Sequence, residues 1–335
     1  MSILVVGSVA LDRIQTPFGR VEESLGGSAT YFSAAASLYD RVNLVAVVGT
    51  DFPQEHVDFF KQRRVNLDGL QFAEGKTFRW SGRYGYDMDT AETLDTQLNV
   101  FATFRPELPD DYRDSELVFL GNIDPGLQLD VLSQIRSAKL TVLDTMNYWI
   151  SYRREKLSEA ISAVDIVLIN EAEVRQYTKC QSLLRGARQI LAQGPKALVV
   201  KLGQYGAVMF ANGDEPARSF FFAPAYPLEK VIDPTGAGDS FAGGFIGYLA
   251  QQNRVTTERW DQVIKDEIKC AIIHGSVVAS YTVENFGVEG LRSITLPDIL
   301  ARYQEFQAFT NFAPTCPWSD SCEHLHASHG ADRQG

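Results

Sequence analysis

Cysteine is scarce in this sequence of 335 residues, which contains four: Cys180, Cys270, Cys316 and Cys322. So few cysteines exclude a fold held together by a disulfide framework and favour a reducing compartment. Long apolar runs are also missing, since none approaches the roughly 20 residues that a membrane-spanning helix needs. The first residues, MSILVVGSVALD, lack a basic leader with a cleavage site. We therefore expect a cytoplasmic protein with no membrane partner.

Positive charge is in the minority. Lysine and arginine number 31 against 42 aspartates and glutamates, so the formal net charge is −11. This balance argues against general binding of nucleic acid, although a local basic pocket for a small anion remains open. The hydrophobic fraction of 45% is ordinary for a globular protein. A chain of this length then fits one large α/β domain or two medium ones.

Short apolar runs alternate with helical patterns through most of the chain. Such alternation predicts an α/β fold, with a Rossmann-like, mostly parallel sheet covered by helices on both faces. After Asp239 the chain becomes mainly helical. The strand candidates are Ile3–Val6, Asn43–Val48, Leu117–Leu120, Leu140–Leu143, Ile166–Ile169 and Leu198–Leu202. The helical patterns are Ala29–Tyr39, Glu55–Arg63, Leu127–Arg136, Glu155–Ile161, Leu183–Leu191, Phe241–Ala250, Val263–Tyr281 and Pro297–Phe312.

Residues 76–104 break this alternation, because they indicate β structure without room for crossover helices. The side chains of Phe78, Trp80, Tyr84 and Tyr86 share one face, at a period of two. The segment predicts a small antiparallel sheet, which about residues 12–24 would join. An apolar sheet face must cover something, so we favour a lid over a ligand or a contact between two subunits. An ordinary edge hairpin is the alternative.

The tail from residue 313 to 335 has no apolar period and is rich in proline, serine, glycine and histidine. It is expected to be disordered. Its cysteines and histidines match no compact zinc spacing, and no predicted strand or helix frames them.

The sequence VIDPTGAGDSFAGGF, residues 231–245, places glycines in a turn between an extended segment and a helix. The first amides of a helix lack intrahelical partners, and the positive end of the helix dipole lies behind them. Gly236, Ala237 and Gly238 have little or no side chain, so an anion could approach their N–H groups closely. The turn therefore predicts an anion hole suited to a phosphoryl group.

Asp239 follows this turn directly. A carboxylate there competes with a bound anion unless it serves a neighbouring hydroxyl, whose proton it would accept as the phosphoryl group arrives. Its place at a helix N-terminus predicts a low pKa, and hence a residue that positions first and accepts a proton late. The simpler alternative is that Asp239 only caps the helix.

The string DPTGAGDSFAGGF resembles the C-terminal signature of the ribokinase-like carbohydrate kinases, the PfkB family, at both aspartate and both glycine positions. SLGGSATYFSAAAS, residues 24–37, resembles the family's first signature. Gly7 and Asp12 match its strand-end glycine and acidic residue. The resemblance covers residues 1–312 in family order. It implies one kinase domain with a β lid, and ATP-dependent phosphorylation of a hydroxyl on a sugar or, alternatively, on a nucleoside.

The resemblance also implies roles for individual residues. Asp12, Gly26 and Gly27 would bind the acceptor, and Glu173 would hold Mg²⁺, through water. A monovalent cation is a further candidate cofactor. In isolation Asp12 could equally be a turn residue, Glu173 a solvated helix acid, and Gly203 and Gly206 a hairpin turn. The residues implied in nucleotide binding are Asn170, Lys201, Gly203, Gly206, Asp233 and Thr235.

The acceptor is left open among fructose phosphate, ribose, inositol and adenosine. Residues 144–147 follow a strand and either face the substrate or cap the strand. Further candidates without an assigned contact are Phe18, Tyr86, Arg105, Asn122 and Asn147.

Three alternatives to this kinase need to be weighed: a P-loop protein, a dinucleotide-binding protein and a non-catalytic sensor. Glu74-Gly75-Lys76-Thr77 lacks the upstream glycine and the following helix of a P-loop, and VVGSVA lacks the later glycines of a dinucleotide site. A non-catalytic sugar or nucleoside sensor on the same fold is the stronger rival, although it would have no need for Asp239.

Overall fold

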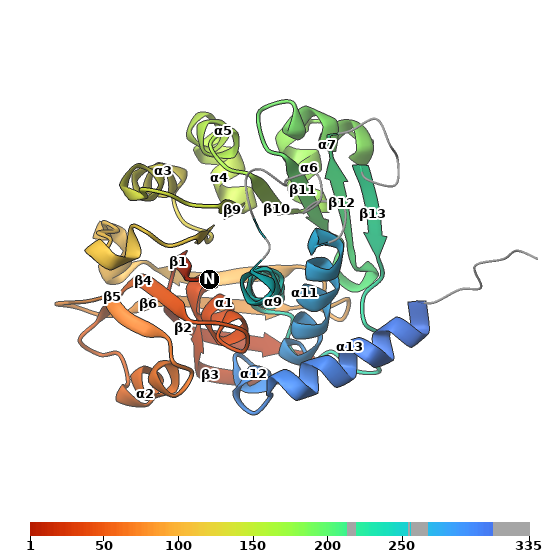
Figure 1. The fold of residues 1–335 in the computed structure, drawn as a ribbon. Coiled ribbons are helices and arrows are strands. Elements are labelled where there is room, and N and C mark those ends of the chain that lie inside the picture. The colour runs from red at the N-terminus through yellow and green to blue at the C-terminus, as the bar shows by residue number, and fades with distance from the viewer. Residues whose placement is uncertain (213–218, 254, 256–266, 311–335) are drawn as a thin grey trace, which may run out of the picture.

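A nine-stranded sheet forms the centre of the computed structural model, which describes residues 1–335 except 213–218, 254, 256–266 and 311–335 (Figure 1). The seven strands from β11 to β5 are parallel, and β12 and β13 continue the sheet antiparallel at one edge. In spatial order the strands are β13 (Phe220–Ala223), β12 (Ala207–Ala211), β11 (Ala197–Lys201), β10 (Ile166–Asn170), β9 (Leu140–Asp144), β8 (Leu117–Leu120), β1 (Ile3–Val6), β4 (Val42–Gly49) and β5 (Asn66–Ala73).

Helices cover both faces of the sheet, as predicted. Successive side chains of each buried strand point to opposite faces, so each face carries apolar side chains that helices must cover. Ile3 and Val5 of β1 belong to one core, and Leu4 and Val6 belong to the other. The first core is covered by α1 (Ser28–Ala36), α2 (Gln54–Gln62), α9 (Ala237–Gln252), α11 (Ile268–Thr282), α12 (Glu289–Arg292) and α13 (Leu296–Thr310). The second is covered by α3 (Pro125–Gln134), α4 (Asn147–Tyr152), α5 (Arg154–Ser162), α6 (Glu171–Thr178) and α7 (Leu183–Leu191).

Helix α9 lies between α1 and α11 (Figure 1). Its run of small residues allows this close packing: a β-carbon at Gly243 would lie 2.5 Å from the carbonyl oxygen of Phe32 in α1, and one at Gly244 would lie 2.8 Å from Val278 in α11. The small residues that follow Asp239 therefore let the helix behind the glycine turn approach its neighbours.

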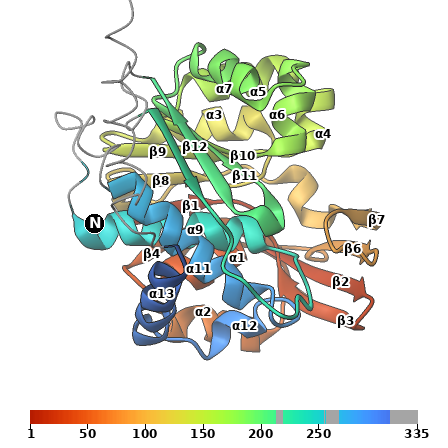
Figure 2. The same ribbon diagram turned by 90° about the vertical axis from the view of Figure 1, so that its right-hand side faces the viewer.

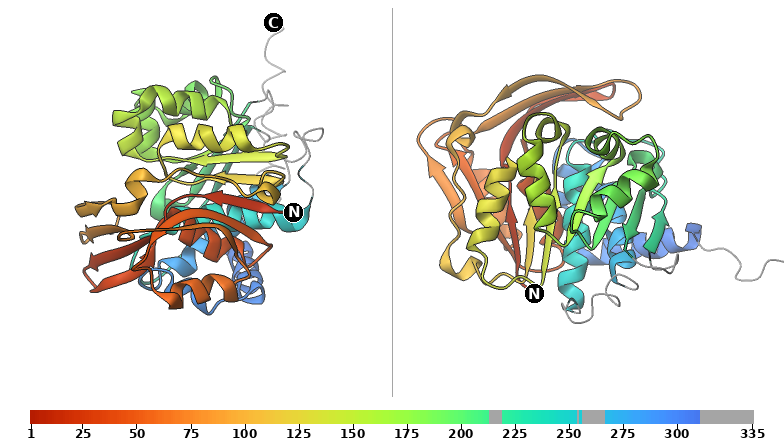
Figure 3. Two further views of the ribbon diagram at one scale, coloured as in Figure 1. Left: turned by 90° about the vertical axis from the view of Figure 1, so that its left-hand side faces the viewer. Right: turned by 90° about the horizontal axis from the view of Figure 1, so that it is seen from above.

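The predicted small sheet is present at one end of the body, beside the nine-stranded sheet (Figures 2 and 3). It consists of two antiparallel hairpins joined by a parallel pairing of β2 with β6. Phe78 stacks on Phe101 at its base, whereas Tyr86 is 94% exposed and covers nothing in the described structure. In order, its strands are β3 (Gly19–Gly26), β2 (Ala10–Thr16), β6 (Phe78–Tyr84) and β7 (Ala91–Gln97).

The predicted strands and helices are found near their expected positions, and several elements were not predicted. These are β5, β12, β13, α4, α6, α12 and the short 3₁₀ helices η1 (Asn99–Thr103), η2 (Asp110–Tyr112) and η3 (Gly203–Tyr205). The first part of the helix predicted over 263–281, the last residues of the helix predicted over 297–312, and the tail 313–335 lie outside the described residues. Across the part of the chain that the structure describes, no helix is both long and apolar enough to cross a membrane.

Candidate active site

Polar side chains collect where the central parallel strands end. Asp144, Asn170 and Lys201 are the last residues of the adjacent strands β9, β10 and β11. The pairing places Asn170 opposite Lys201, and the first turn of α9 lies against the lysine. In open α/β sheets this edge is where ligands bind.

The glycine turn leads into α9 as predicted. Gly236 adopts a φ of 74°, and a β-carbon there would lie 2.3 Å from the ring of Tyr31, so only glycine fits. The N–H of Ala237 donates to the carbonyl of Pro234 at 3.2 Å. The prediction that the amide of Ala237 belongs to the anion hole is therefore corrected, because this amide already bonds within the turn. The N–H groups of Gly236 and Gly238 have no protein acceptor among the described residues.

Asp233 and Thr235 hold this turn in place. The two oxygens of Asp233 accept from the N–H of Thr235 and the N–H of Gly287, both at 2.9 Å. The hydroxyl of Thr235 lies 3.2 Å from that of Tyr84, which belongs to lid strand β6. Both residues were predicted to bind nucleotide; in this structure their side chains build the turn and connect it to the lid.

Lys201 is the cation at the centre of the site. Its Nζ forms a 2.7 Å ion pair with Asp144, which is 3% exposed. A β-carbon at Gly238 would lie 3.0 Å from the same Nζ. The negative charges of Asp144 and Glu173 raise the pKa of Lys201 despite its desolvation, so the ammonium group stays charged. A fixed positive charge therefore lies at the mouth of α9.

Asp239, one residue further along α9, is half-buried. Desolvation and the nearby charge of Asp144 raise its pKa to about 7, against the opposing effect of Lys201. The prediction of a low pKa was therefore wrong, because burial and a like charge outweigh the helix dipole here. A carboxylate with a pKa near neutrality is matched to accepting a proton.

Asp12 lies in lid strand β2 and is 4% exposed, and one of its oxygens, Oδ1, has no partner among the described residues. Burial, together with the charges of Asp233 and Asp239, raises its pKa to about 8. A β-carbon at Gly26 would lie 1.9 Å from the other oxygen, so Gly26 makes room for this carboxyl. Gly27, with a φ of 91°, then starts α1.

Asn170 and Glu173 form a reciprocal cap at the start of α6. The Asn170 side chain accepts from the N–H of Glu173 at 2.8 Å, and the Glu173 carboxylate accepts from the N–H of Asn170 at 3.0 Å. Desolvation raises the pKa of Glu173 to about 7. Gly203 and Gly206 have positive φ in the turn between β11 and β12, which agrees with the simple turn that was the alternative to a nucleotide contact.

Of the candidates without assigned contacts, Asn122 and Asn147 both lie at helix α4. Phe18, at the turn between β2 and β3, has the Nζ of Lys230 4.8 Å above its ring. Asn122 receives a hydrogen bond from Trp149 at 2.8 Å. Arg105 donates to the carbonyl of Phe104, and Asn147 is the first residue of α4.

The rejected P-loop segment, Glu74-Gly75-Lys76-Thr77, joins strands β5 and β6. A P-loop is followed by a helix, so this observation confirms the rejection.

Sequence reasoning missed Tyr31 and Tyr84, which both lie beside the glycine turn. Tyr31 is buried in α1 beneath Gly236, and Tyr84 reaches the turn from the lid. Aromatic residues at these positions gave no local signal beyond that of a core helix and a lid strand.

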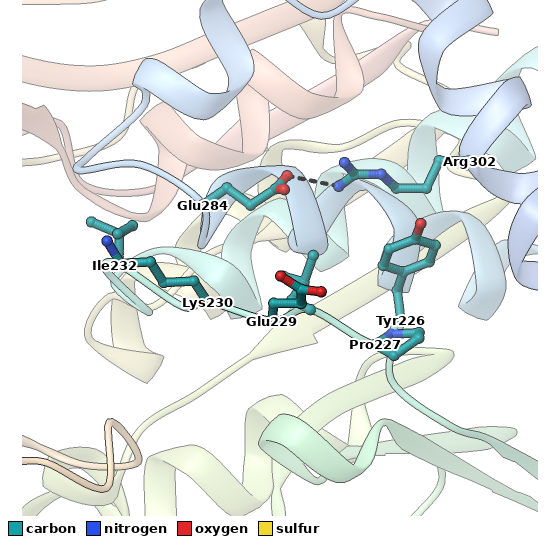
Figure 4. Close-up of a pocket in the computed structure, with 8 residues that line it drawn as sticks. Tyr226, Pro227, Glu229, Lys230, Ile232, Glu284 and Arg302 are labelled. Carbon is teal, nitrogen blue, oxygen red and sulfur yellow. Dashed lines mark hydrogen bonds and ion pairs between the residues drawn. The ribbon is translucent and has the colours of Figure 1, made fainter.

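A cleft of about 390 Å³ borders the loop that leads into the turn (Figure 4). Its arginine, Arg302, pairs with Glu284 at 2.8 Å and lies 3.5 Å above the ring of Tyr281. The guanidinium group of Arg302 is therefore already engaged by a carboxylate and an aromatic ring.

The sequence profile of the pfkB family carbohydrate kinases matches residues 2–292, and the chain belongs to this family. It is an enzyme, a phosphotransferase that acts on a hydroxyl group of a sugar or nucleoside.

Individual kinases are similar to this chain in sequence or in structure. The chain is 31% identical to a cytidine kinase of Thermococcus kodakarensis over 79% of its length and 96% of the relative's. It is 24% identical to a nucleoside kinase of Methanocaldococcus jannaschii over 86% and 92%. The solved ribokinase of Giardia lamblia has a TM-score of 0.75 at 19% identity, over 91% of this chain and 99% of that one, which shows the shared fold.

Proposed function

We propose that the enzyme is a nucleoside kinase that transfers the γ-phosphoryl group of ATP to a ribose hydroxyl. The similarity to a cytidine kinase over 79% of the chain carries the choice of acceptor class. The paired placement of Asp12 and Asp239 around the glycine turn is what an alcohol acceptor needs. A sugar acceptor, supported by the ribokinase-like fold, is the second candidate.

Asp12 and Asp239 have different roles in this proposal. Asp12, with a free oxygen under the lid, orients the acceptor. Asp239 receives the proton of the reacting hydroxyl while the phosphoryl group is transferred in line. Because its pKa is about 7, Asp239 is partly ionised at neutral pH and becomes a stronger base than an exposed aspartate.

The amides of Gly236 and Gly238 and the ammonium group of Lys201 stabilise the negative charge of the transferred group. These donors are fixed before the reaction, so little reorganisation is needed. Asn170, Gly203 and Gly206 border the place of the nucleotide.

Magnesium would enter with the ATP phosphates and neutralise their charge. One oxygen of Glu173 is occupied by the cap on Asn170, which leaves the other for water bound to the ion. This arrangement fits a magnesium held through water. A monovalent cation stays a further candidate, without an assigned ligand set.

The lid also supports a proposal about assembly. Leu94 of β7 and Leu98 after it are 49% and 46% exposed, and Tyr86 is more exposed still. We propose that these side chains meet the same surface of a second copy, in a cytoplasmic homodimer. Size-exclusion chromatography with light scattering tests this: Leu94→Lys with Leu98→Lys should yield monomers, whereas a monomeric wild-type enzyme would contradict it.

An acceptor panel tests the proposed function. The purified enzyme is incubated with MgATP and cytidine, adenosine, inosine, ribose or myo-inositol, and ADP formation is measured. We expect the highest kcat/KM with a nucleoside. A clear preference for free ribose or inositol would instead support the sugar kinase. Saturable ligand binding with no ADP formed from any acceptor would support the sensor.

A further inference from the structure

Tyr31 carries a buried hydroxyl group for which the fold supplies no partner. The residue is 1% exposed, and its hydroxyl makes no hydrogen bond to any described residue. Folded proteins pair nearly all their buried hydroxyls, because an unpaired hydroxyl has lost its hydrogen bonds to water without replacement. A ligand in the adjoining site could supply the missing partner.

The position of Tyr31 ties it to the active site. Its ring supports Gly236, to which no β-carbon could be added without striking the ring. Burial, and then the charges of Asp233 and Asp12, raise the pKa of Tyr31 well above its ordinary value, so the hydroxyl remains a hydrogen-bond donor. The phenol therefore lies among the carboxylates that surround the glycine turn.

Asp12 provides the complementary unpaired atom. Its Oδ1 is also buried without a partner, and it comes from β2, which pairs with the strand that leads into the helix of Tyr31. The Tyr31 hydroxyl is a donor, and Oδ1 of Asp12 can accept either as a carboxylate oxygen or as the carbonyl oxygen of the protonated carboxyl group. An alcohol can accept from the first and donate to the second, so it would satisfy both.

Other hydroxyls on helices α1 and α9 also lack partners in the described structure, namely those of Thr30, Ser33 and Ser240. Short hydroxyl side chains can turn back to the carbonyls of the preceding helical turn. The phenol oxygen of Tyr31 lies at the end of a rigid ring and has no such local substitute. Its lack of a partner thus points to a ligand.

We propose that the Tyr31 hydroxyl donates a hydrogen bond to the acceptor, so that Tyr31 and Asp12 together hold one alcohol group of its sugar moiety. This inference rests on the proposed function, because it needs an acceptor with several hydroxyls. Tyr31 contacts the acceptor and not the transferred phosphoryl group. Its contribution is therefore to acceptor binding, with little effect on the chemical step.

Tyr31→Phe removes the hydroxyl oxygen alone and leaves the ring beneath Gly236. We expect the KM for cytidine to rise about tenfold, with kcat and the KM for MgATP within about twofold of the wild type. The thermal midpoint of the free enzyme should stay unchanged or rise, because an unpaired buried group is removed. Weaker acceptor binding without lost stability is a result that a purely structural hydroxyl would not give.

Tyr39→Phe is the matched control. The Tyr39 hydroxyl is paired with Nδ1 of His274 at 3.0 Å, away from the glycine turn. Its removal should lower the thermal midpoint by about 2–4 °C and leave the KM for cytidine unchanged.

The outcomes separate the two proposals. If the wild-type enzyme turns over no nucleoside, the proposed function fails and this inference falls with it. If the wild type phosphorylates cytidine and Tyr31→Phe has the same KM, the inference alone is overturned. A thermal midpoint lowered as in Tyr39→Phe, or a loss in kcat at unchanged KM, would overturn it as well.

Discussion

The two ends of the central sheet differ in their carboxylates, although Asp144 at the carboxyl ends is paired with Lys201. At the amino ends of the strands, Asp165 accepts from the N–H and hydroxyl of Thr141, both at 2.9 Å, and pairs with Lys196 at 2.8 Å. Glu116 pairs with Lys139 at 2.6 Å, and this interaction lowers the pKa of Glu116. At the carboxyl ends, burial raises the pKa values of Asp12, Glu173 and Asp239 to between about 7 and 8.

We interpret this difference as a division between one end that contributes stability and one end that we propose carries the chemistry. Paired carboxylates stabilise the folded state at neutral pH, whereas buried carboxylates with raised pKa values destabilise it when they ionise. Such unfavourable groups are retained where a ligand will meet them. Substitutions at one end of the sheet test this interpretation, and residues at the other end provide controls.

Asp239→Asn should have the largest effect. Loss of the proton acceptor should lower kcat by roughly 10²–10⁴-fold, while acceptor binding stays nearly intact. The variant should remain folded, because asparagine removes a half-buried charge and has nearly the same size as aspartate. Steady-state kinetics and acceptor titration by calorimetry measure both effects. Near-normal turnover in this variant would refute the role of Asp239.

Lys201→Met should come next. It leaves the buried Asp144 without its counter-ion, so we expect a loss of about 3 kcal/mol in the free energy of unfolding and a raised KM for MgATP. Adding Asp144→Asn should recover much of the stability but not the KM. Urea unfolding measures the first quantity.

Lys139→Met at the amino end is the control for Lys201→Met, and it should cost about 0.5 kcal/mol because its ion pair is exposed. Equal losses for the two lysine variants would remove the distinction between the two ends.

Asp12→Asn should stabilise the free enzyme in a pH-dependent way. The folded pKa of Asp12 is about 8 against an ordinary value of 3.8 for the unfolded chain, so the folded state holds an extra proton and its stability falls as pH rises from about 4 to 8. Asparagine removes that loss. The thermal midpoint of the variant should therefore exceed that of the wild type by at least about 2 °C at pH 8, and by less at pH 5.

Asp165→Asn tests the opposite end in the same assay. Its carboxylate is paired, so the variant should have a lower midpoint than the wild type at pH 8. A rise in this variant, or a fall in Asp12→Asn, would contradict the comparison.

Glu116→Gln should have the smallest effect. The folded pKa of Glu116 is lowered, so its contribution is present above pH 4.5 and is lost as pH falls through the folded pKa. Because Glu116 and Lys139 are partly exposed, we expect a loss of about 0.5 kcal/mol at pH 7 and unchanged kcat. Chemical unfolding at pH 7 and pH 3 checks this, and an equal loss at both values would show that charge is not responsible.

The sequence allowed the local parts of this site to be predicted. The glycine turn before α9 and the Gly26-Gly27 entry to α1 depend on neighbouring residues, and both are found. The pairing of Lys201 with Asp144 depends on strand order, and the contact of Tyr84 with Thr235 depends on how the lid meets the body. Neither could be inferred from spacing along the chain.

The pKa of Asp239 shows the same limit. Its place at a helix N-terminus was a local feature and predicted a low value. The value is raised because the body desolvates the carboxyl group and because β9, distant in sequence, brings Asp144 close. Local reasoning placed Asp239 at the start of a helix correctly but predicted the wrong direction for the shift of its pKa.

The pH dependence of kcat/KM for the acceptor, at saturating MgATP, tests most directly whether the carboxyl end of the sheet provides a base poised near neutrality. We predict that kcat/KM falls tenfold per pH unit below about pH 7, and that the residual activity of Asp239→Asn lacks this decline. A wild-type kcat/KM that stays constant down to pH 5 would contradict the account.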